Sequence, residues 1–130
     1  MVKDYILDTH VLLWSIFDSD KLSKSVQQIL LNMDCRKFIS IGSMWEISIK
    51  NRIGKLPLPN NGISDVFDEA EMNGFGLLGI DRKCIELYNT LPLIHRDPFD
   101  GIIIATAVSK KMTVITADEN IQKYNVQWIW

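Results

Sequence analysis

The sequence predicts an α/β protein with three layers, in which helices cover both faces of a parallel β-sheet. Short apolar segments alternate along the chain with segments of helical periodicity, as in folds built from strand–helix–strand units. The short segments are apolar at consecutive positions, a pattern typical of parallel strands buried on both faces. The chain has 130 residues, of which 47% are hydrophobic and 23% charged, so we expect a single globular domain over residues 1–130.

Five segments have the length and composition of buried strands, and polar residues bound each of them. They are residues 5–7 (YIL), 38–41 (FISI), 77–80 (LLGI), 113–116 (TVIT) and, with a weaker pattern, 126–129 (VQWI). The segments between them have apolar residues at helical spacing. The expected helices cover residues 11–16, 23–33, 43–52, 63–72, 83–91 and 98–111.

The bulk properties exclude several classes of protein. No apolar stretch approaches the length of a membrane span, and Lys3, Asp4 and Asp8 interrupt the N-terminal segment in a way that is unlike a signal peptide. We therefore expect a cytoplasmic protein. The net charge of −2 argues against a general nucleic-acid coat protein. Cys35 and Cys84 have no metal-ligand spacing, so we expect free thiols.

Carboxylates follow the predicted strands at the points where those strands end. In open parallel sheets, ligands bind beyond the carboxyl ends of the strands. The acids placed there are Asp8, Glu46, Asp81 and Asp118, while Asp97 and Asp100 open the helix that leads into the fourth strand. Several carboxylates at one sheet edge repel each other, and a divalent cation removes this conflict. Mg²⁺ and Mn²⁺ prefer oxygen ligands, so the pattern predicts a hard metal rather than zinc.

Each of these acids also has a purely structural interpretation. Asp81 is a typical helix N-cap before RKCIEL, and Asp118 suits the start of a last short helix. Glu46 can form an ion pair with Lys50 four residues later. Asp8 is the hardest to explain structurally, because a carboxylate next to a buried strand is costly unless it is paired or binds a metal. The shared placement of the acids carries the prediction.

Other chemically active side chains have simpler interpretations. His10 and His95 are expected at a helix start and in a loop rather than as ligands. The tryptophans are expected in the core or at a subunit contact; they are residues 14, 45, 128 and 130. Lys50, Arg52 and Lys55 form a basic group that is either a solvated helix end or a phosphate-binding group, and both interpretations stay open.

The segment RDPFDG places two carboxylates in the first turn of a helix. Pro98 suits the first helical position, which makes Asp97 the N-cap and puts Asp100 at the third position. A capping box would account for both acids. Alternatively, Asp97 alone caps the helix and Asp100 faces the carboxyl edge of the sheet that Asp8 also reaches.

Four sequence segments resemble the PIN-domain ribonucleases, and most closely the VapC-like toxins of type II toxin–antitoxin pairs. They are YILDTHVLLW, SMWEISIK, LPLIHRDPFDGIIIATA and VITADENIQKY, which occur in the same order as in that family and span essentially the whole chain. The resemblance implies a five-stranded parallel sheet and metal-dependent endonucleolytic cleavage of RNA, with Mg²⁺ or Mn²⁺ as cofactor. It also implies a homodimer and a cognate antitoxin as partner.

The resemblance also implies roles for individual residues. The catalytic and metal-binding acids would be Asp8, Glu46, Asp100 and Asp118. Thr9, Thr116 and Asp97 would support them, and Lys50, Arg52 and Arg96 are candidate RNA contacts. The sequence departs from the family's pattern at Gly101, where related toxins usually have an arginine directly after the third acid.

Three other functions are alternatives to a ribonuclease. A phosphate-receiver domain needs two adjacent acids after the first strand, whereas LDTH has one. A haloacid-dehalogenase-like phosphatase needs an Asp two residues after the first, and that residue is His10. A degenerate, non-catalytic PIN fold acting as a binding module stays open because of Gly101. Its set of acids is nevertheless intact, which favours an enzyme.

Overall fold

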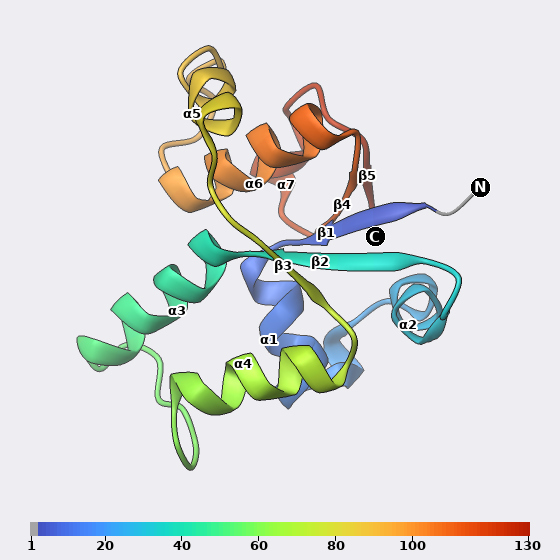
Figure 1. Ribbon diagram of the computed structural model, residues 1–130, viewed down its shortest axis with the longest axis vertical. Helices are drawn as coiled ribbons and strands as arrows, with labels where there is room; N and C mark the ends of the chain where they lie inside the picture. The colour runs from blue at the N-terminus through green and yellow to red at the C-terminus, as the bar shows by residue number, and fades with distance from the viewer. Residues whose placement is uncertain (1–2) are drawn as a thin grey trace.

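The computed structural model describes residues 3–130, which form a parallel sheet flanked by helices on both faces (Figure 1). Within these residues the sheet has five strands in the order β3-β2-β1-β4-β5. Every neighbouring pair is parallel. The predicted fold class and the five-stranded parallel sheet are therefore confirmed. The strands are β1 (Asp4–Leu7), β2 (Arg36–Ser40), β3 (Gly76–Leu78), β4 (Thr113–Ile115) and β5 (Trp128–Ile129).

All the predicted helices are present, with ends that differ from the prediction by a few residues. They are α1 (Thr9–Phe17), α2 (Lys24–Leu31), α3 (Ile41–Arg52), α4 (Ile63–Met72), α5 (Arg82–Tyr88), α6 (Pro98–Lys110) and the short α7 (Glu119–Gln122), with a 3₁₀ turn η1 (Ser19–Lys21). Ile41 was expected in the second strand but begins α3, because the Ser40 side chain accepts a hydrogen bond from Gly42 N and so caps the helix. In residues 3–130, no helix combines the length and apolar character that a membrane crossing requires.

Alternate residues of the central strands supply two separate cores. Tyr5 and Leu7 of β1 pack in a cluster with side chains of α1, α2, α3 and α4, whereas Ile6 packs in a cluster with α6 and α7. Figure 1 shows the same division, with α1–α4 below the sheet and α5–α7 above it. Because successive side chains of a strand point to opposite faces, β1 is buried on both sides. The three-layer arrangement follows.

The two edge strands are less buried than their apolar sequences predicted. Leu77 in β3 has 51% of its surface exposed, and Trp128 in β5 is also exposed. An edge strand has a neighbour on one side only, and the helical layers cover the centre of the sheet more fully than its edges. The prediction of a buried strand at residues 77–80 is therefore wrong for burial, although β3 itself is present.

The tryptophans divide between the core and the surface. Trp14 and Trp130 pack against the core of the α1–α4 face, with ring centroids 5.8 Å apart. Trp45 on α3 and Trp128 are exposed, so a core position is wrong for these two. Trp45 makes an edge contact with the Phe99 ring, with centroids 5.4 Å apart. Both cysteines are free thiols, as expected.

Candidate functional site

Asp8 lies directly after β1 and begins α1. Its Oδ1 accepts a hydrogen bond from Val11 N (2.8 Å), and its Oδ2 accepts one from the Thr116 hydroxyl (2.5 Å). Only 3% of the residue's surface is exposed. Burial raises the pKa of the Asp8 carboxyl, and the hydrogen bonds from Thr116 and Val11 partly offset that effect. The hardest acid to explain from the sequence is thus a helix cap and a buried carboxyl at once.

The ends of β1 and β4 meet where the strand order reverses, the usual ligand position in such sheets. Leu7 pairs with Ile115, so the residues that follow, Asp8 and Thr116, lie side by side. Thr116 Oγ1 also accepts a hydrogen bond from Asp118 N (3.0 Å). Asp118 caps α7 by accepting from Asn120 N (2.8 Å). One hydroxyl therefore joins the two acids at this edge.

Glu46 is buried on α3, and both of its oxygens have partners. Oε1 accepts a hydrogen bond from the Thr9 hydroxyl (2.7 Å), and Oε2 lies 2.9 Å from Lys50 Nζ. The hydrogen bond to Glu46 raises the pKa of Lys50, which stays charged. The i, i+4 pair expected from the sequence is therefore present. It leaves Glu46 as a fixed carboxylate at the carboxyl end of β2.

Asp97 and Asp100 lie in different surroundings at the start of α6. Asp97 is the N-cap, with Oδ1 accepting from Phe99 N (2.8 Å) and Asp100 N (3.2 Å), and Pro98 follows at the first helical position. Asp100 lies in the first turn and is 9% exposed. The predicted cap is confirmed for Asp97. Asp100 is a buried acid that makes no capping bond among residues 3–130.

Asp100 lies among several other acidic side chains. Its pKa is raised from an ordinary value of 3.8 to about 8, first by burial and then by nearby negative charges. Those charges belong to Asp97, Asp118, Glu46 and Asp8, in decreasing order of effect. The fold thus brings the other three acids predicted from the resemblance, and Asp97, around the buried carboxyl of Asp100. We call these five side chains the acidic group.

His95 was expected at a loop or helix start rather than as a ligand. It does lie in the loop before α6, and the structure brings its side chain next to the acidic group. Its Nε2 lies 3.2 Å from Asp100 Oδ2. Ligand atoms of His95, Asp97 and Asp100 lie within 4.8 Å of one another, a spacing suited to a metal ion. The signal was available in HRDPFD, where His95 precedes the cap by two residues. Nothing in that spacing alone distinguishes an inward-facing side chain from a solvated one.

The four predicted ligands do not converge as tightly as that trio. Each of the other three acids is held by its own hydrogen bonds. Asp8 accepts from Thr116 and Val11 N, Glu46 accepts from Thr9 and Lys50, and Asp118 accepts from Asn120 N. The donors of the acidic group are carboxylate oxygens, with one imidazole beside them. Mg²⁺ and Mn²⁺ prefer such oxygen donors and commonly retain water ligands, so the set fits either cation.

The remaining predicted residues have clear positions. Arg52 and Arg96 are exposed, and Lys50 is the candidate RNA contact that touches an acid, namely Glu46. Asp81 caps α5 through Cys84 N (2.9 Å), as its structural interpretation predicted, and it is absent from the charges that act on Asp100.

Gly101 leaves room for a neighbouring ring and not for a side chain of its own. A Cβ atom at Gly101 would lie 2.3 Å from Tyr88 Cε2 and 2.8 Å from Tyr88 Cδ2. The Tyr88 ring of α5 therefore packs directly on the backbone of α6. An arginine at this position would require Tyr88 to move.

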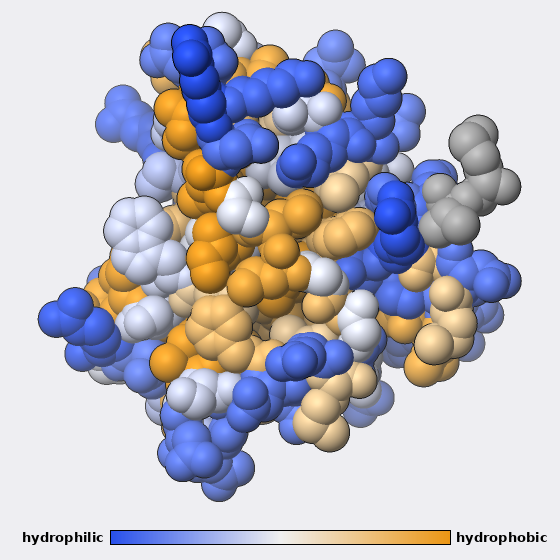
Figure 2. Space-filling view, in the orientation of Figure 1, coloured by the Kyte–Doolittle hydropathy of each residue, from blue (hydrophilic) through white to orange (hydrophobic). Residues whose placement is uncertain are grey.

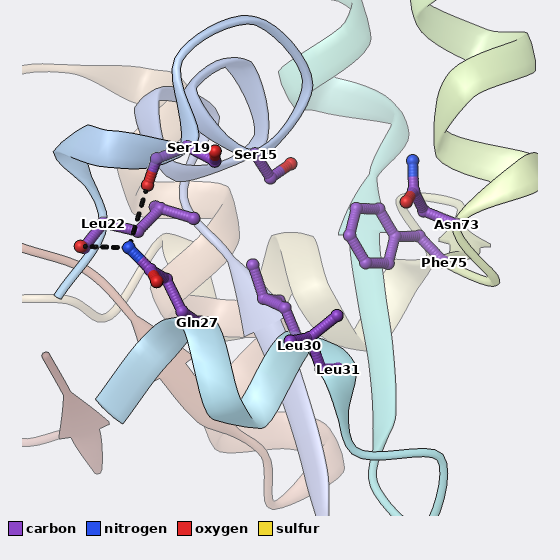
Figure 3. Close-up of a pocket in the computed structure, with 8 residues that line it drawn as sticks. All are labelled: Ser15, Ser19, Leu22, Gln27, Leu30, Leu31, Asn73 and Phe75. Carbon is purple, nitrogen blue, oxygen red and sulfur yellow. Dashed lines mark hydrogen bonds between the residues drawn. The ribbon is translucent and has the colours of Figure 1, made fainter. Parts of the chain in front are cut away.

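A separate pocket of about 230 Å³ lies between η1, α2 and the segment before β3 (Figure 3). Gln27 spans one side of it, with Nε2 donating to the carbonyl oxygens of Ser19 and Leu22 at 3.1 Å. Leu30 and Phe75 supply apolar surface. The pocket has no acid or histidine in its lining, so it is distinct from the acidic group.

Comparison with known proteins places this arrangement in one family. The PIN domain family model matches residues 5–127. Among solved structures, VapBC2 from Rickettsia felis bound to a promoter DNA fragment matches with a TM-score of 0.70 and 13% identity, covering 97% of each chain. FitAcB from Neisseria gonorrhoeae matches with a TM-score of 0.66 and 20% identity, covering 97% of this chain and 96% of the other.

A third match, VapBC-1 from nontypeable Haemophilus influenzae, has a TM-score of 0.63 and 20% identity, with coverage of 97% and 96%. At these identities the structural matches establish the shared fold. The family model spans nearly the whole chain, including the acidic group and both strands that meet at it. The chain therefore belongs to the PIN-domain family.

Proposed function

We propose that this protein is a metal-dependent endoribonuclease that hydrolyses RNA phosphodiester bonds and acts as the toxin of a toxin–antitoxin pair. The observation that carries the proposal is Asp100, whose pKa is raised first by burial and then by the charges of four surrounding acids. A cluster with this much negative charge is unfavourable on its own and favourable around a divalent cation. PIN-domain proteins are typically nucleases, and the matched structures include toxin–antitoxin complexes.

Each residue of the acidic group has a part in the proposed chemistry. Asp8, Glu46, Asp100 and Asp118 would hold Mg²⁺ or Mn²⁺, with His95 as an additional ligand. The bound cation would lower the pKa of the attacking water and neutralise charge that develops on the phosphate. Thr116 fixes the orientation of Asp8, and one carboxylate of the group accepts the proton of the water.

The supporting residues fix the geometry on which that chemistry depends. Thr9 and Lys50 hold the two oxygens of Glu46, and Asp97 fixes the first turn of α6 on which Asp100 lies. A preformed set of ligands avoids the cost of ordering them when metal and substrate bind. Lys50 would also place a positive charge beside an RNA phosphate held at the acids, and the exposed Arg52 and Arg96 are further candidate RNA contacts.

The proposed partners are an antitoxin and a second copy of the chain, both in the cytoplasm. The matched structures include VapBC2 from Rickettsia felis, VapBC-1 from nontypeable Haemophilus influenzae and a toxin–antitoxin complex from Klebsiella pneumoniae. Figure 2 shows apolar side chains gathered over the middle of one face, where Figure 1 places β3. Leu77 and Ile80 are exposed there, and Trp45 is 61% exposed. Burial of such surface would favour a C2 dimer.

Cleavage of labelled RNA by the purified protein tests the enzymatic proposal. We expect cleavage with Mg²⁺ or Mn²⁺, none in EDTA, and none in Asp8→Asn, which keeps the shape of the side chain and removes its charge. Undiminished cleavage by a metal-free preparation would contradict the proposal. Light scattering tests the dimer, which a monomeric mass at micromolar concentration would exclude.

A non-catalytic PIN fold is the second candidate, favoured by the departure at Gly101. The Tyr88 ring occupies the space next to the Gly101 backbone, so the basic side chain that related toxins usually have at this position would require that ring to move. In that case RNA would bind with no cleavage under any metal. A cleavage assay combined with a binding measurement on the same RNA distinguishes the two functions.

A further inference from the structure

A pocket of about 170 Å³ lies directly beside the acidic group, between the end of α5, the loop before α6 and the first turn of α6. His95 and Asp97 belong both to its wall and to the cluster around Asp100. A molecule bound at the acids can therefore extend into this pocket without leaving the surface. Typical pockets for drug-sized ligands measure about 300–1,000 Å³, so this one suits a single ring system.

Tyr88 forms the aromatic wall of the pocket, and Gly101 determines its position. The ring lies so close to the backbone of α6 that a Cβ at Gly101 would be 2.3 Å from Tyr88 Cε2. Glycine is therefore the residue that lets this ring approach. Tyr88 remains partly exposed to solvent. A planar ligand can stack on such a ring.

The opposite wall is held in place by Tyr124, which is buried. Its hydroxyl accepts a hydrogen bond from His95 N (3.0 Å) and lies 3.4 Å from His95 O, so it ties the loop before α6 to the body of the protein. Asn89 also lines the pocket, and its side chain carries an amide. An amide both donates and accepts hydrogen bonds, which is the chemistry that distinguishes the edges of nucleobases.

We propose that this pocket, the Tyr88 pocket, receives one unstacked base of a single-stranded RNA whose phosphodiester lies at the acidic group. Tyr88 is the stacking surface, Asn89 contacts the base edge, and Gly101 and Tyr124 are positioning residues. The inference rests on the proposed ribonuclease function, because that function places the sugar–phosphate chain at His95 and Asp97. Sequence-selective recognition of single-stranded RNA generally combines stacking on aromatic rings with contacts to base edges.

The first test measures binding without cleavage. The probes are the four nucleoside 5′-monophosphates, with ribose 5-phosphate as a control that lacks the base, each titrated in Mg²⁺ and followed by NMR shifts of the Gly101 and Asn89 amides. Stacking of one base on an aromatic side chain predicts about tenfold tighter binding of the preferred nucleotide than of ribose 5-phosphate. Equal affinity for the five probes would overturn the proposal.

Variants of the pocket show whether Tyr88 causes the difference. Tyr88→Leu is expected to reduce the advantage of the nucleotide to near zero, whereas Tyr88→Phe keeps the ring and should keep the advantage. Gly101→Ala should act like Tyr88→Leu, because its Cβ displaces the ring while alanine favours the helix. Ile85→Ala, on the same helix but outside the pocket lining, is the matched control and should bind like the unmodified protein. Nucleotide preference that survives in Tyr88→Leu would refute the assignment.

The second test separates this inference from the proposed function. Short RNAs that vary at one position beside the cut site should be cleaved with a base preference that Tyr88→Leu abolishes and Tyr88→Phe retains. Cleavage without base-dependent binding would leave the ribonuclease intact and remove the Tyr88 pocket. Base-dependent binding without any cleavage would retain the pocket and remove the ribonuclease.

Discussion

Asp97 and Asp100 are three residues apart and have different physical states. The carboxylate of Asp97 accepts hydrogen bonds from two backbone N–H groups and so caps α6. Asp100 is more buried and has four negative neighbours, which favour its neutral form in the absence of metal. The same residue type therefore caps a helix at one position and, at the other, lies buried among acids as a proposed metal ligand.

Asp100→Asn should abolish cleavage and stabilise the metal-free protein near pH 8. Asparagine has nearly the same shape and lacks the charge that burial and the neighbouring acids oppose. We expect a gain on the order of 1–3 kcal/mol, or roughly 3–10 °C in thermal midpoint. Cleavage rate and calorimetric midpoint in EDTA check both parts. A variant that is inactive and also less stable would show that Asp100 supports the fold.

Asp97→Asn should leave cleavage largely intact, because asparagine caps a helix about as well as aspartate. Asp97→Ala removes the acceptor of Phe99 N and Asp100 N and should cost about 1 kcal/mol of stability. Thermal melts and cleavage rates of both variants provide the test. A folded Asp97→Asn that is as inactive as Asp100→Asn would place Asp97 among the metal ligands, as its closeness to His95 allows.

At the scale of elements, the turn from β4 into α7 depends on one hydroxyl. Thr116 donates to Asp8 and accepts from Asp118 N, so it joins the ends of β1 and β4. Thr116→Val keeps the shape, leaves the buried Asp8 Oδ2 without its hydrogen bond and removes the acceptor of the half-buried Asp118 N, at a cost of about 1–3 kcal/mol. Thr116→Ser keeps the hydroxyl and is the matched control.

The two Thr116 variants should also differ in their affinity for metal. Without its hydrogen bond, Asp8 is less well oriented, so calorimetric titration with Mn²⁺ should show weaker binding to Thr116→Val than to Thr116→Ser. Loss of an outer-shell partner typically costs about 10–100-fold in affinity. Equal affinities would show that the hydroxyl supports the fold and not the site.

For the whole molecule, the raised pKa values predict how stability depends on pH. Between the ordinary pKa of 3.8 and the folded pKa of about 8, folded Asp100 retains a proton that the unfolded chain has released. Metal-free protein should therefore lose stability as pH rises through this range, and Asp8 adds to the effect. Bound Mg²⁺ or Mn²⁺ should oppose this loss. It should add about 2.7 kcal/mol to the free energy of unfolding when the metal concentration is a hundred times its Kd.

Thermal melts at several pH values, in EDTA and in saturating Mn²⁺, measure this dependence. Asp100→Asn is the control and should flatten the slope in EDTA. The cleavage rate should rise over the same range, because the acids must release protons before they bind metal. A rate maximum near pH 4 in saturating metal, or metal-free stability that climbs with pH, is the opposite of what the acidic group predicts.

The sequence by itself determined the order and type of the elements, and the acids that follow the strands. The apolar pattern of residues 113–116 predicted a strand, and Pro98 predicted a helix start, because both effects act between neighbours along the chain. The same local chemistry predicted the caps at Asp81 and Asp97, and the Glu46–Lys50 pair. Long apolar segments and caps need no tertiary information.

Tertiary structure alone decided how exposed the edge strands are, and which side chains meet. Leu77 has an apolar sequence around it, yet it lies at the sheet edge, a property of strand order. Tyr88 packs on Gly101 through a contact between α5 and α6 that no local pattern encodes, and the fold also decides that the His95 side chain lies beside Asp100 rather than in solvent. The raised pKa of Asp100 has the same origin. Burial is its first cause, and the charges of Asp118, Glu46 and Asp8 add to that of the neighbouring Asp97 only once the chain has folded.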